Sequence, residues 1–367
     1  KPLPFSFSRA SSGTVVNKDG LIETVGTGEP RIDFKDNTKG ALLLEPTRSN
    51  LIAYSNGFDN VAWVKLGQGI GSAPIVTPNY AISPDGTLNA SRLQCDLNGG
   101  NTTNDRSWLY QSISTITGNN AFSLYVKNNS NEDITFSLTN GSSETVVVLS
   151  DDKWHRLSTV RSGGGQPRIG LIGGIGASDN ADLLIYAAQL EQGSYATSYI
   201  PTSGSAVTRV ADVCNNGANE QVINSTEGVL YLETKGFIDV PSSSEYIQLS
   251  KNGEASFNNS LTIQHRNNGY LRVYVNGTAT SGIHFNENID FTENHKIAVL
   301  YKLNGYKLFI DGVSQSLFGT PTQTVFSGLD NLSFDLRDAL NWNGSIKDVR
   351  IYNTALTDQE LIALTTI

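Results

Sequence analysis

The chain has 367 residues, which exceeds the usual size of one compact core and suits two domains. Its net charge of −9 and lack of any Lys/Arg cluster argue against nucleic-acid binding, because such proteins displace phosphate counterions with basic residues. The sequence contains no run of about 18 apolar residues, the length that a membrane-spanning helix needs. Charged residues make up only 17% of the chain and Gly, Asn, Ser and Thr are abundant, which favours short strands and turns over long helices.

Residues 1–47 predict a short β extension. An Asn-Lys-Asp-Gly turn at 17–20 lies between two short apolar runs, which is typical of a hairpin. A third apolar run, Ala-Leu-Leu-Leu at 41–44, is closed by Pro46. We expect this extension to pack on the domain that follows it. Because the chain starts with Lys1 rather than Met, we also expect it to be a piece of a longer protein.

Residues 48–211 predict a first β-sandwich. Apolar and polar residues alternate in segment after segment, as in residues 122–127 and 134–139, and polar turns separate the segments. Short alternating strands at roughly ten-residue spacing are typical of a sandwich or jelly roll. A parallel α/β fold is excluded, because no helical crossover lies between the strands.

Residues 212–224 predict a linker and residues 225–367 a second β-sandwich. Small polar residues around Pro201 and the Asn-Asn-Gly at 215–217 mark the boundary. Turns at 276–277, 304–305 and 311–312 separate the later strands. The chain ends in one clear helix, since Thr357 and Glu360 form a capping-box pattern before an apolar face. The predicted fold class is therefore all-β: two β-sandwich (jelly-roll) domains with an N-terminal β extension and one C-terminal helix.

The second domain resembles the laminin-G-like, concanavalin A-like jelly rolls. The residues that carry the resemblance are YKLFIDGV at 306–313 and NGSIKDVRIYNTALTDQEL at 343–361. The second stretch is the more specific, because it combines a last strand, a Tyr-Asn turn and a capped helix. The resemblance implies a lectin-like sandwich over about the last 140 residues.

The first part resembles modules common in bacteriophage tail and other virion proteins. Three stretches carry this resemblance: FSRASSGT at 7–14, ALLLEPTRSNL at 41–51 and AQLEQGSYATSYIPT at 188–202. The segment between the last two looks like the jelly roll of a carbohydrate-binding module. Similar stretches occur in bacterial cell-surface proteins. The resemblance implies a virion or an extracellular, cell-surface location, with other virion or appendage subunits as partners and a homotrimer as one arrangement.

Residues suited to catalysis are scarce. Concanavalin A-like glycan hydrolases carry closely spaced acids in an E-x-D-x-x-E arrangement, and the second domain has none, so we predict no enzyme activity. The histidines show no metal-binding spacing. They are His155, His265, His284 and His295.

Cys95 and Cys214 have no Cys-x-x-Cys partner. We expect two buried free thiols, with one disulfide between them as the alternative. No cofactor is expected to be required. The acidic loops at 151–152 and 179–182 could hold structural calcium, because calcium prefers carboxylate oxygens in turns; solvated loop acids are the alternative.

Aromatic residues at strand positions facing away from the core are the candidates for a sugar site. Sugars present apolar C–H faces and hydroxyl rims, so their sites combine rings with polar side chains. In the second domain Tyr270, Arg272 and Tyr274 lie opposite the apolar residues of their strand. The other candidates are Trp108, Tyr110, Tyr125 and Lys127 in the first domain and Trp342 in the loop before the last strand. Alternatively, these rings pack against a loop or a neighbouring subunit, and a one-residue register slip would exchange them with core residues.

These features favour a non-catalytic attachment protein of a phage tail fibre or similar surface appendage that binds cell-surface polysaccharide or other glycans. One alternative is a structural virion protein whose sandwiches hold subunits together. Another is a set of ancillary binding modules from a secreted polysaccharide-degrading enzyme. We expect no nucleic-acid partner and no membrane insertion.

Overall fold

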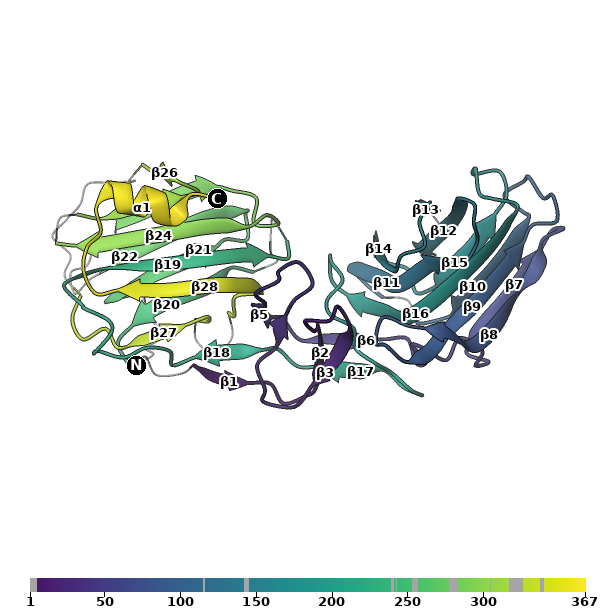
Figure 1. Ribbon diagram of the computed structural model, residues 1–367, viewed down its shortest axis with the longest axis horizontal. Helices are drawn as coiled ribbons and strands as arrows, with labels where there is room; N and C mark the ends of the chain where they lie inside the picture. The colour runs from purple at the N-terminus through teal and green to yellow at the C-terminus, as the bar shows by residue number, and fades with distance from the viewer. Residues whose placement is uncertain are drawn as a thin grey trace. The chain divides into compact units, whose positions relative to one another are not determined.

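The computed structural model describes residues 5–114, 116–141, 145–238, 241, 243–252, 257–276, 283–303, 305–316, 326–336 and 340–367. In this part of the chain strands dominate, which confirms the all-β prediction (Figure 1). The chain divides into two compact units, each built from separate segments. Unit 1 comprises Lys1–Ser12, Val25–Pro46 and Val210–Ile367, and unit 2 comprises Gly13–Thr24 and Thr47–Arg209.

Unit 2 is a sandwich of two five-stranded antiparallel sheets. Their strand orders are β13-β12-β15-β10-β7 and β14-β11-β16-β9-β8, and the pairs β2-β3 and β17-β6 lie outside them. The strands are β2 (Gly13–Val16), β3 (Ile22–Val25, whose last residue falls in unit 1), β6 (Arg48–Asn50), β7 (Trp63–Gln68), β8 (Ser72–Ile82), β9 (Leu88–Asp96), β10 (Arg106–Gln111), β11 (Asn119–Asn128), β12 (Ile134–Asn140), β13 (Thr145–Leu149), β14 (His155–Ser162), β15 (Pro167–Ile172), β16 (Asn180–Gln192) and β17 (Val207–Arg209).

Unit 1 is a second sandwich, of a seven-stranded and a five-stranded sheet. The orders are β26-β25-β24-β19-β28-β5-β4 and β23-β22-β21-β20-β27, with β1 paired to β18. Its elements are β1 (Ser6–Ser8), β4 (Ile32–Asp33), β5 (Ala41–Leu44), β18 (Val213–Asn215), β19 (Glu227–Gly236), β20 (Glu245–Ser250), β21 (Ser260–His265), β22 (Tyr270–Asn276), β23 (Ile283–Asn288), β24 (His295–Lys302), β25 (Lys307–Ile310), β26 (Val313–Ser314), β27 (Asn331–Ser333), β28 (Gly344–Tyr352) and helix α1 (Asp358–Thr365).

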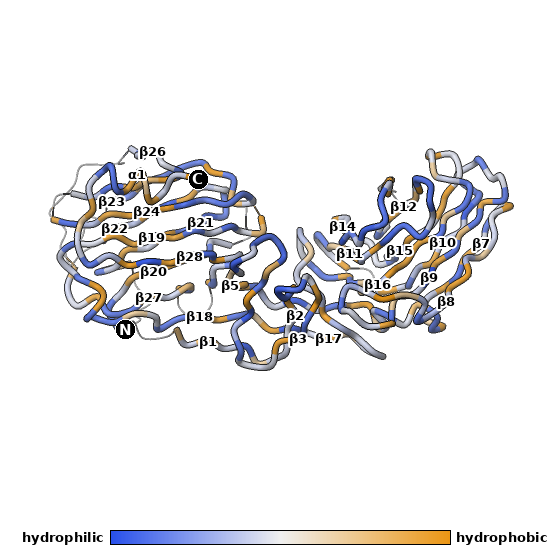
Figure 2. The backbone as a smooth tube through the Cα atoms, in the orientation of Figure 1, coloured by the Kyte–Doolittle hydropathy of each residue, from blue (hydrophilic) through white to orange (hydrophobic). Residues whose placement is uncertain are grey.

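Alternation along the strands builds the two cores. On β11, Phe122, Leu124 and Val126 are fully buried in the core of unit 2, as the sequence predicts. On β22, Leu271 and Val273 are fully buried in the core of unit 1. Hydrophobic and hydrophilic residues follow one another along single strands (Figure 2). Because burial of a Leu, Val or Phe side chain contributes about 1.5–3 kcal/mol, these positions fix the strand registers.

The N-terminal segment differs from its prediction. Most of residues 1–47 belongs to unit 1, and only the β2–β3 hairpin and its neighbours join unit 2. Strand β5 pairs with β28 in the seven-stranded sheet, with Leu44 opposite Gly344. The prediction that 1–47 packs on the domain following it is therefore wrong for 5–12 and 25–46. Local patterns reveal a strand but not its partner, which here lies at the far end of the chain.

The predicted linker at 212–224 is also part of unit 1. It contains β18, in which Cys214 pairs with Phe7 of β1. Cys214 and Ile223 are buried in the core. Of the Asn and Gly residues that suggested a linker, Asn215 ends β18 and Gly217 forms an isolated β-bridge with Leu332, so the segment is fixed in the fold.

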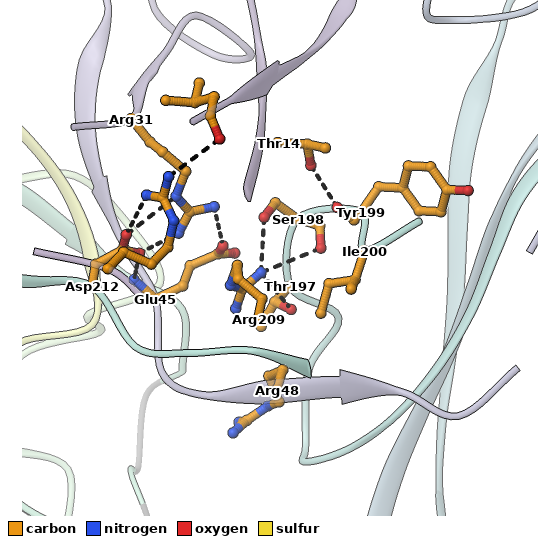
Figure 3. A network of polar contacts seen from close by, with 12 residues as sticks. Thr14, Arg31, Glu45, Arg48, Thr197, Ser198, Tyr199, Ile200, Arg209 and Asp212 are labelled. Atoms are coloured by element: carbon orange, nitrogen blue, oxygen red, sulfur yellow. Dashed lines mark hydrogen bonds and ion pairs between the residues drawn. The ribbon is translucent and has the colours of Figure 1, made fainter. Parts of the chain in front are cut away.

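Buried ion pairs hold the N-terminal segment of unit 1 (Figure 3). Arg31 bonds to both carboxylates, Asp212 and Glu45, with 2.6 Å between its Nη1 and Glu45 Oε2. Arg9 Nη1 lies 3.0 Å from Asp212 Oδ1. Burial alone would lower the pKa of Arg31, but attraction to Glu45 and Asp212 outweighs it and the pKa is raised. The guanidinium therefore stays charged and ties residues 31, 45 and 212 together.

Helix α1 covers part of the outer face of the seven-stranded sheet. Thr357 Oγ1 accepts a hydrogen bond from Glu360 N and Glu360 returns one to the Thr357 backbone, so the predicted capping box is confirmed. Leu361 is fully buried in a cluster with Val229 and Phe309, and α1 lies beside β24 in Figure 1. The turn predicted at 311–312 is likewise present between β25 and β26, with positive φ at both residues. The turns predicted at 276–277 and 304–305 include residues outside the described part.

Candidate functional site: two outward sheet faces

The five-stranded sheet of unit 1 turns an aromatic and polar face away from its core. Along β22, the side chains alternate between fully buried core residues and Tyr270, Arg272 and Tyr274, which are not buried; Tyr270 is 40% exposed. The predicted strand faces are therefore confirmed here. Neighbouring strands add outward side chains in the same registers, for example Gln264 opposite Arg272 and Tyr246 opposite Gln264.

Rings form a continuous row on this face. The centroid of Phe257 lies 5.9 Å from that of Tyr246 and 5.4 Å from that of Tyr274. Tyr274 in turn lies 6.1 Å from His284. The Arg272 guanidinium stacks 4.6 Å above the Tyr274 ring and donates to its hydroxyl. These contacts fix the ring planes, so little side-chain entropy would be lost on binding a ligand.

Amides and hydroxyls lie between the rings. Gln264 Nε2 donates to Tyr246 Oη at 2.9 Å, and Gln248 Nε2 donates to Thr262 Oγ1 at 3.0 Å. Ser333 Oγ on β27 donates to Asn331 at 2.7 Å. We call the set of these outward residues on β20–β23 and β27, together with Phe257, the aromatic–amide face.

Four buried polar atoms on the aromatic–amide face have no hydrogen-bond partner within the described residues. They are Ser250 Oγ, Gln264 Oε1, Arg272 Nε and Asn286 Oδ1. Gln264 is 7% exposed and Ser250 2% exposed. An unpaired buried polar group costs about 1–3 kcal/mol, so such atoms gain from an added partner. They mark polar side chains whose hydrogen bonding is incomplete within the described part of this face.

His284 borders the aromatic–amide face on β23. Burial lowers its pKa, and the neighbouring Arg272 and Arg266 charges lower it further. The imidazole is therefore neutral near pH 7 and can both donate and accept a hydrogen bond.

Unit 2 carries a smaller candidate on β10. Trp108 and Tyr110 share the outward face, because Leu109 between them is fully buried in the core. Arg106 and Arg168 lie 4.7 Å and 4.3 Å from the Trp108 ring, so the indole is only 5% exposed. Its Nε1 is buried without a partner in the described part of the chain.

Gly170, opposite Trp108 on β15, gives this ring its room. A Cβ at this position would come within 2.6 Å of Trp108 Cα, and its φ of +153° disfavours any side chain.

Tyr125 and Lys127 do not join Trp108 and Tyr110. They lie on β11, in the other sheet of unit 2. Tyr125 packs 6.2 Å from Tyr186 in a small satellite cluster and 5.6 Å from the Arg156 guanidinium. For Tyr125 the contacts therefore match the alternative interpretation, in which a ring packs within the protein.

Trp342 is not at the surface. It is fully buried in the core of unit 1, where its ring lies 5.6 Å from Phe291 and 6.2 Å from His265. The prediction of Trp342 as a ligand-contacting residue is therefore corrected. A loop position before a strand suggested exposure, but burial of a large indole outweighs that local tendency.

The sequence did not single out Tyr246, Phe257, Gln264 or Asn286. In the structure Tyr246 lies opposite Gln264, and Gln264 lies opposite Arg272 of β22, so these side chains share one sheet face. Their alternation is visible in the sequence, but membership of one face depends on register between strands.

The remaining groups with metal-binding or redox chemistry are the His, Cys, Asp and Glu side chains of the described residues. No group of three or more His, Cys, Asp or Glu side chains converges there in a way that could hold a metal ion. Cys95 and Cys214 are both buried free thiols, as expected. No helix in the described part is long and apolar enough to span a membrane.

The match to a known family lies within unit 1. Residues 238–362 match the concanavalin A-like lectin/glucanases superfamily. This span contains β20 to β28 and most of α1, so it includes the aromatic–amide face. The match supports the predicted resemblance of the C-terminal part to the concanavalin A-like jelly rolls. A search of curated proteins found no match.

Several solved structures are similar to this chain at low identity. A carbohydrate-binding module (CBM40) of the Ruminococcus gnavus IT-sialidase bound to α2,3-sialyllactose is 18% identical, with a TM-score of 0.33, and the match covers 39% of this chain and 84% of that chain. Laminin α1 domains LG4-5 from mouse are 11% identical, with a TM-score of 0.26 and coverage of 80% and 94%. Trypanosoma rangeli sialidase is 10% identical, with a TM-score of 0.32 and coverage of 76% and 51%.

Proposed function

We propose that this protein binds glycans without cleaving them and serves in attachment, through the aromatic–amide face of unit 1. The observation that carries the proposal is the row of fixed rings beside polar side chains, in which Tyr270 is 40% exposed and Arg272 stacks on Tyr274. A sugar ring would lay a C–H face on Tyr270 or Tyr274. Its hydroxyls would form hydrogen bonds with the half-buried side chains of Asn286 and Arg272 beside these rings.

The acid–base pattern of the face supports binding without hydrolysis. Glycoside hydrolysis generally uses two carboxyl groups on either side of the scissile bond. The outward residues described on β20–β23 are Tyr, Gln, Ser, Thr, Arg, Asn and His, with no Asp or Glu among them.

The biological setting of the proposal is a phage tail fibre or a comparable surface appendage, on a virion or at a cell surface. The three sequence stretches at 7–14, 41–51 and 188–202 that resemble virion and cell-surface modules support it. Other appendage subunits, in a homotrimer for a fibre, would be the protein partners.

A binding assay with intact cells and a panel of polysaccharides tests this function. We expect saturable binding of the full chain, no release of reducing sugar ends, and roughly tenfold weaker binding for both Tyr270→Ala and Arg272→Ala, because each loses a contact of about 1–1.5 kcal/mol. Running the assay with and without a chelator tests whether structural calcium contributes to binding.

Tyr80→Ala is the matched control. Tyr80 lies in unit 2, is 44% exposed and stacks under Arg92, much as Tyr274 stacks under Arg272. Its variant should bind like the parent chain. Full binding by the Tyr270 and Arg272 variants would place the ligand elsewhere, and absence of binding together with a stable oligomer would favour the structural role.

A further inference from the structure

A second, cationic hollow lies on the opposite sheet of unit 1. It has a volume of about 450 Å³ and lies on the outer face of the seven-stranded sheet. Strands β19, β24 and β28, the loop before β5 and helix α1 all contribute to its wall. The lining residues are Asn37, Thr38, Lys39, Tyr231, Glu233, Lys296, Lys347, Asp348, Arg350, Ala363 and Leu364.

The charge in the hollow is positive, although the chain as a whole carries −9. Its lining has four basic and two acidic side chains. Arg350 and Asp348 neutralise each other, because Arg350 Nε and Nη2 lie 2.8 Å and 2.5 Å from Asp348 Oδ2. Neither Lys39 nor Lys347 has an ion-pair partner among the described residues. Two lysine charges are thus left for an incoming anion.

The other two charged side chains of the hollow are Glu233 and Lys296. Glu233 lies directly opposite Lys296 across the β19–β24 ladder. Lys296 Nζ donates to the Thr366 carbonyl at 2.7 Å, which holds this ammonium beside the C-terminal end of α1. The hollow therefore combines an excess of positive charge with one carboxylate, Glu233, that can accept hydrogen bonds.

The floor and one wall are uncharged. Tyr231 is 2% exposed, with the Arg350 guanidinium 5.4 Å from its ring. Burial raises the pKa of Tyr231 to about 12, and the charges of Glu233 and Asp348 add to the shift, so the phenol is neutral at physiological pH. Ala363 and Leu364 of α1 supply an apolar wall.

This combination selects for one ligand chemistry. The lysines attract an anionic group, whereas Glu233 repels a compact dianion such as sulfate but accepts hydrogen bonds from hydroxyls. A ligand with one negative charge, adjacent hydroxyls and a small apolar face would complement the lysines, Glu233 and the apolar wall of α1, respectively. A volume of this size falls in the usual range for small-ligand pockets.

We propose that this hollow binds a carboxylated sugar, with its carboxylate between Lys39 and Lys347 and its hydroxyls toward Glu233. The site lies on the other sheet from the aromatic–amide face and does not depend on it. It would give one sandwich two separate sugar contacts, one of them specific for acidic residues of a polysaccharide.

Titration of the full chain with glucuronate, glucose and sulfate, followed by calorimetry and ligand-observed NMR, tests the proposal. We expect saturable glucuronate binding that weakens with added salt, at least tenfold weaker glucose and sulfate binding, and at least tenfold weaker glucuronate binding in the Lys39→Gln/Lys347→Gln double variant. Lys302→Gln is the matched control, because Lys302 is exposed on β24 but does not line the hollow.

A second variant addresses the hollow by shape rather than charge. Ala363 is exposed on α1, so Ala363→Trp should fold normally and fill the hollow. It should abolish glucuronate binding. Arg272→Ala should leave glucuronate binding unchanged, which separates this site from the aromatic–amide face. Equal binding of glucose or sulfate, or unchanged glucuronate binding by either the double lysine variant or Ala363→Trp, would overturn the proposal.

Discussion

Burial sets the chemistry of the two thiols. Cys95 and Cys214 are each 3% exposed, and they lie in different units. Burial raises the pKa of each thiol to about 12, which for Cys95 outweighs the hydrogen bond with Ser107. The reactive thiolate is therefore scarce at neutral pH, and both side chains act as small apolar core residues.

Alkylation kinetics test this assignment. The folded protein should react with iodoacetamide at pH 8 far more slowly than the denatured protein, in which both thiols should be modified. Labelling can be followed by intact mass. Fast modification of the folded chain would contradict the burial, and failure to label the denatured, unreduced chain would reveal a disulfide instead.

Single residues differ in how well the sequence predicts their position. The outward row Tyr270, Arg272 and Tyr274 was predictable, because three apolar residues alternate with it in a strand of seven residues. The position of Trp342 was not predictable, because no periodic pattern surrounds it. Its burial depends on contacts such as that with Phe291, which lies 51 positions earlier in the chain. Local alternation carries information about faces, whereas the positions of isolated loop residues depend on distant contacts.

At the level of elements, the strands and α1 were readable from the sequence but several pairings were not. The capping box of α1 is a local signal and is present as predicted. The pairings of β5 with β28 and of β1 with β18 each join segments more than 200 residues apart, and no local pattern records them. For the same reason the strand that carries Tyr270 was predictable, but the way in which its neighbours pair with it to complete the aromatic–amide face was not.

The capping box gives a test of α1. Thr357→Ala removes the hydroxyl that caps Glu360 N, so we expect unit 1 to lose about 1 kcal/mol of unfolding free energy. Chemical denaturation measures this loss. Thr354→Ala is the matched control, because Thr354 is exposed and lies just before the cap. Equal effects of the two substitutions would show that the cap contributes nothing specific.

At the level of the whole molecule, segments distant in the sequence complete one unit. Unit 2 is formed mainly by Thr47–Arg209, whereas unit 1 uses segments that both precede and follow it. The buried pairs of Arg31 with Asp212 and Glu45 join these segments within unit 1 (Figure 3). The stability of unit 1 should therefore depend on residues far outside the matched span at 238–362.

Arg31→Ala tests this dependence. Removing one partner of a buried ion pair leaves uncompensated charge, so we expect unit 1 to lose about 3–5 kcal/mol of unfolding free energy, with the effect confined to unit 1. Hydrogen exchange should show lost protection in β5 and β28 and unchanged protection in β11 and β16. Lys35→Ala, an exposed neighbour, should have no effect. Equal loss of protection in both units would contradict the expectation.

The pairing of β5 with β28 has a consequence for synthesis on the ribosome. About 300 residues separate Leu44 from its partner Gly344. At roughly 5–20 residues per second, β5 waits on the order of 15 to 60 seconds for that partner to emerge. During this interval Thr47–Arg209 can already fold, while the apolar residues of β5 remain an unpaired edge that chaperones could bind. A nascent chain that is truncated before β28 would therefore leave the apolar residues of β5, near its N-terminus, without their partner strand.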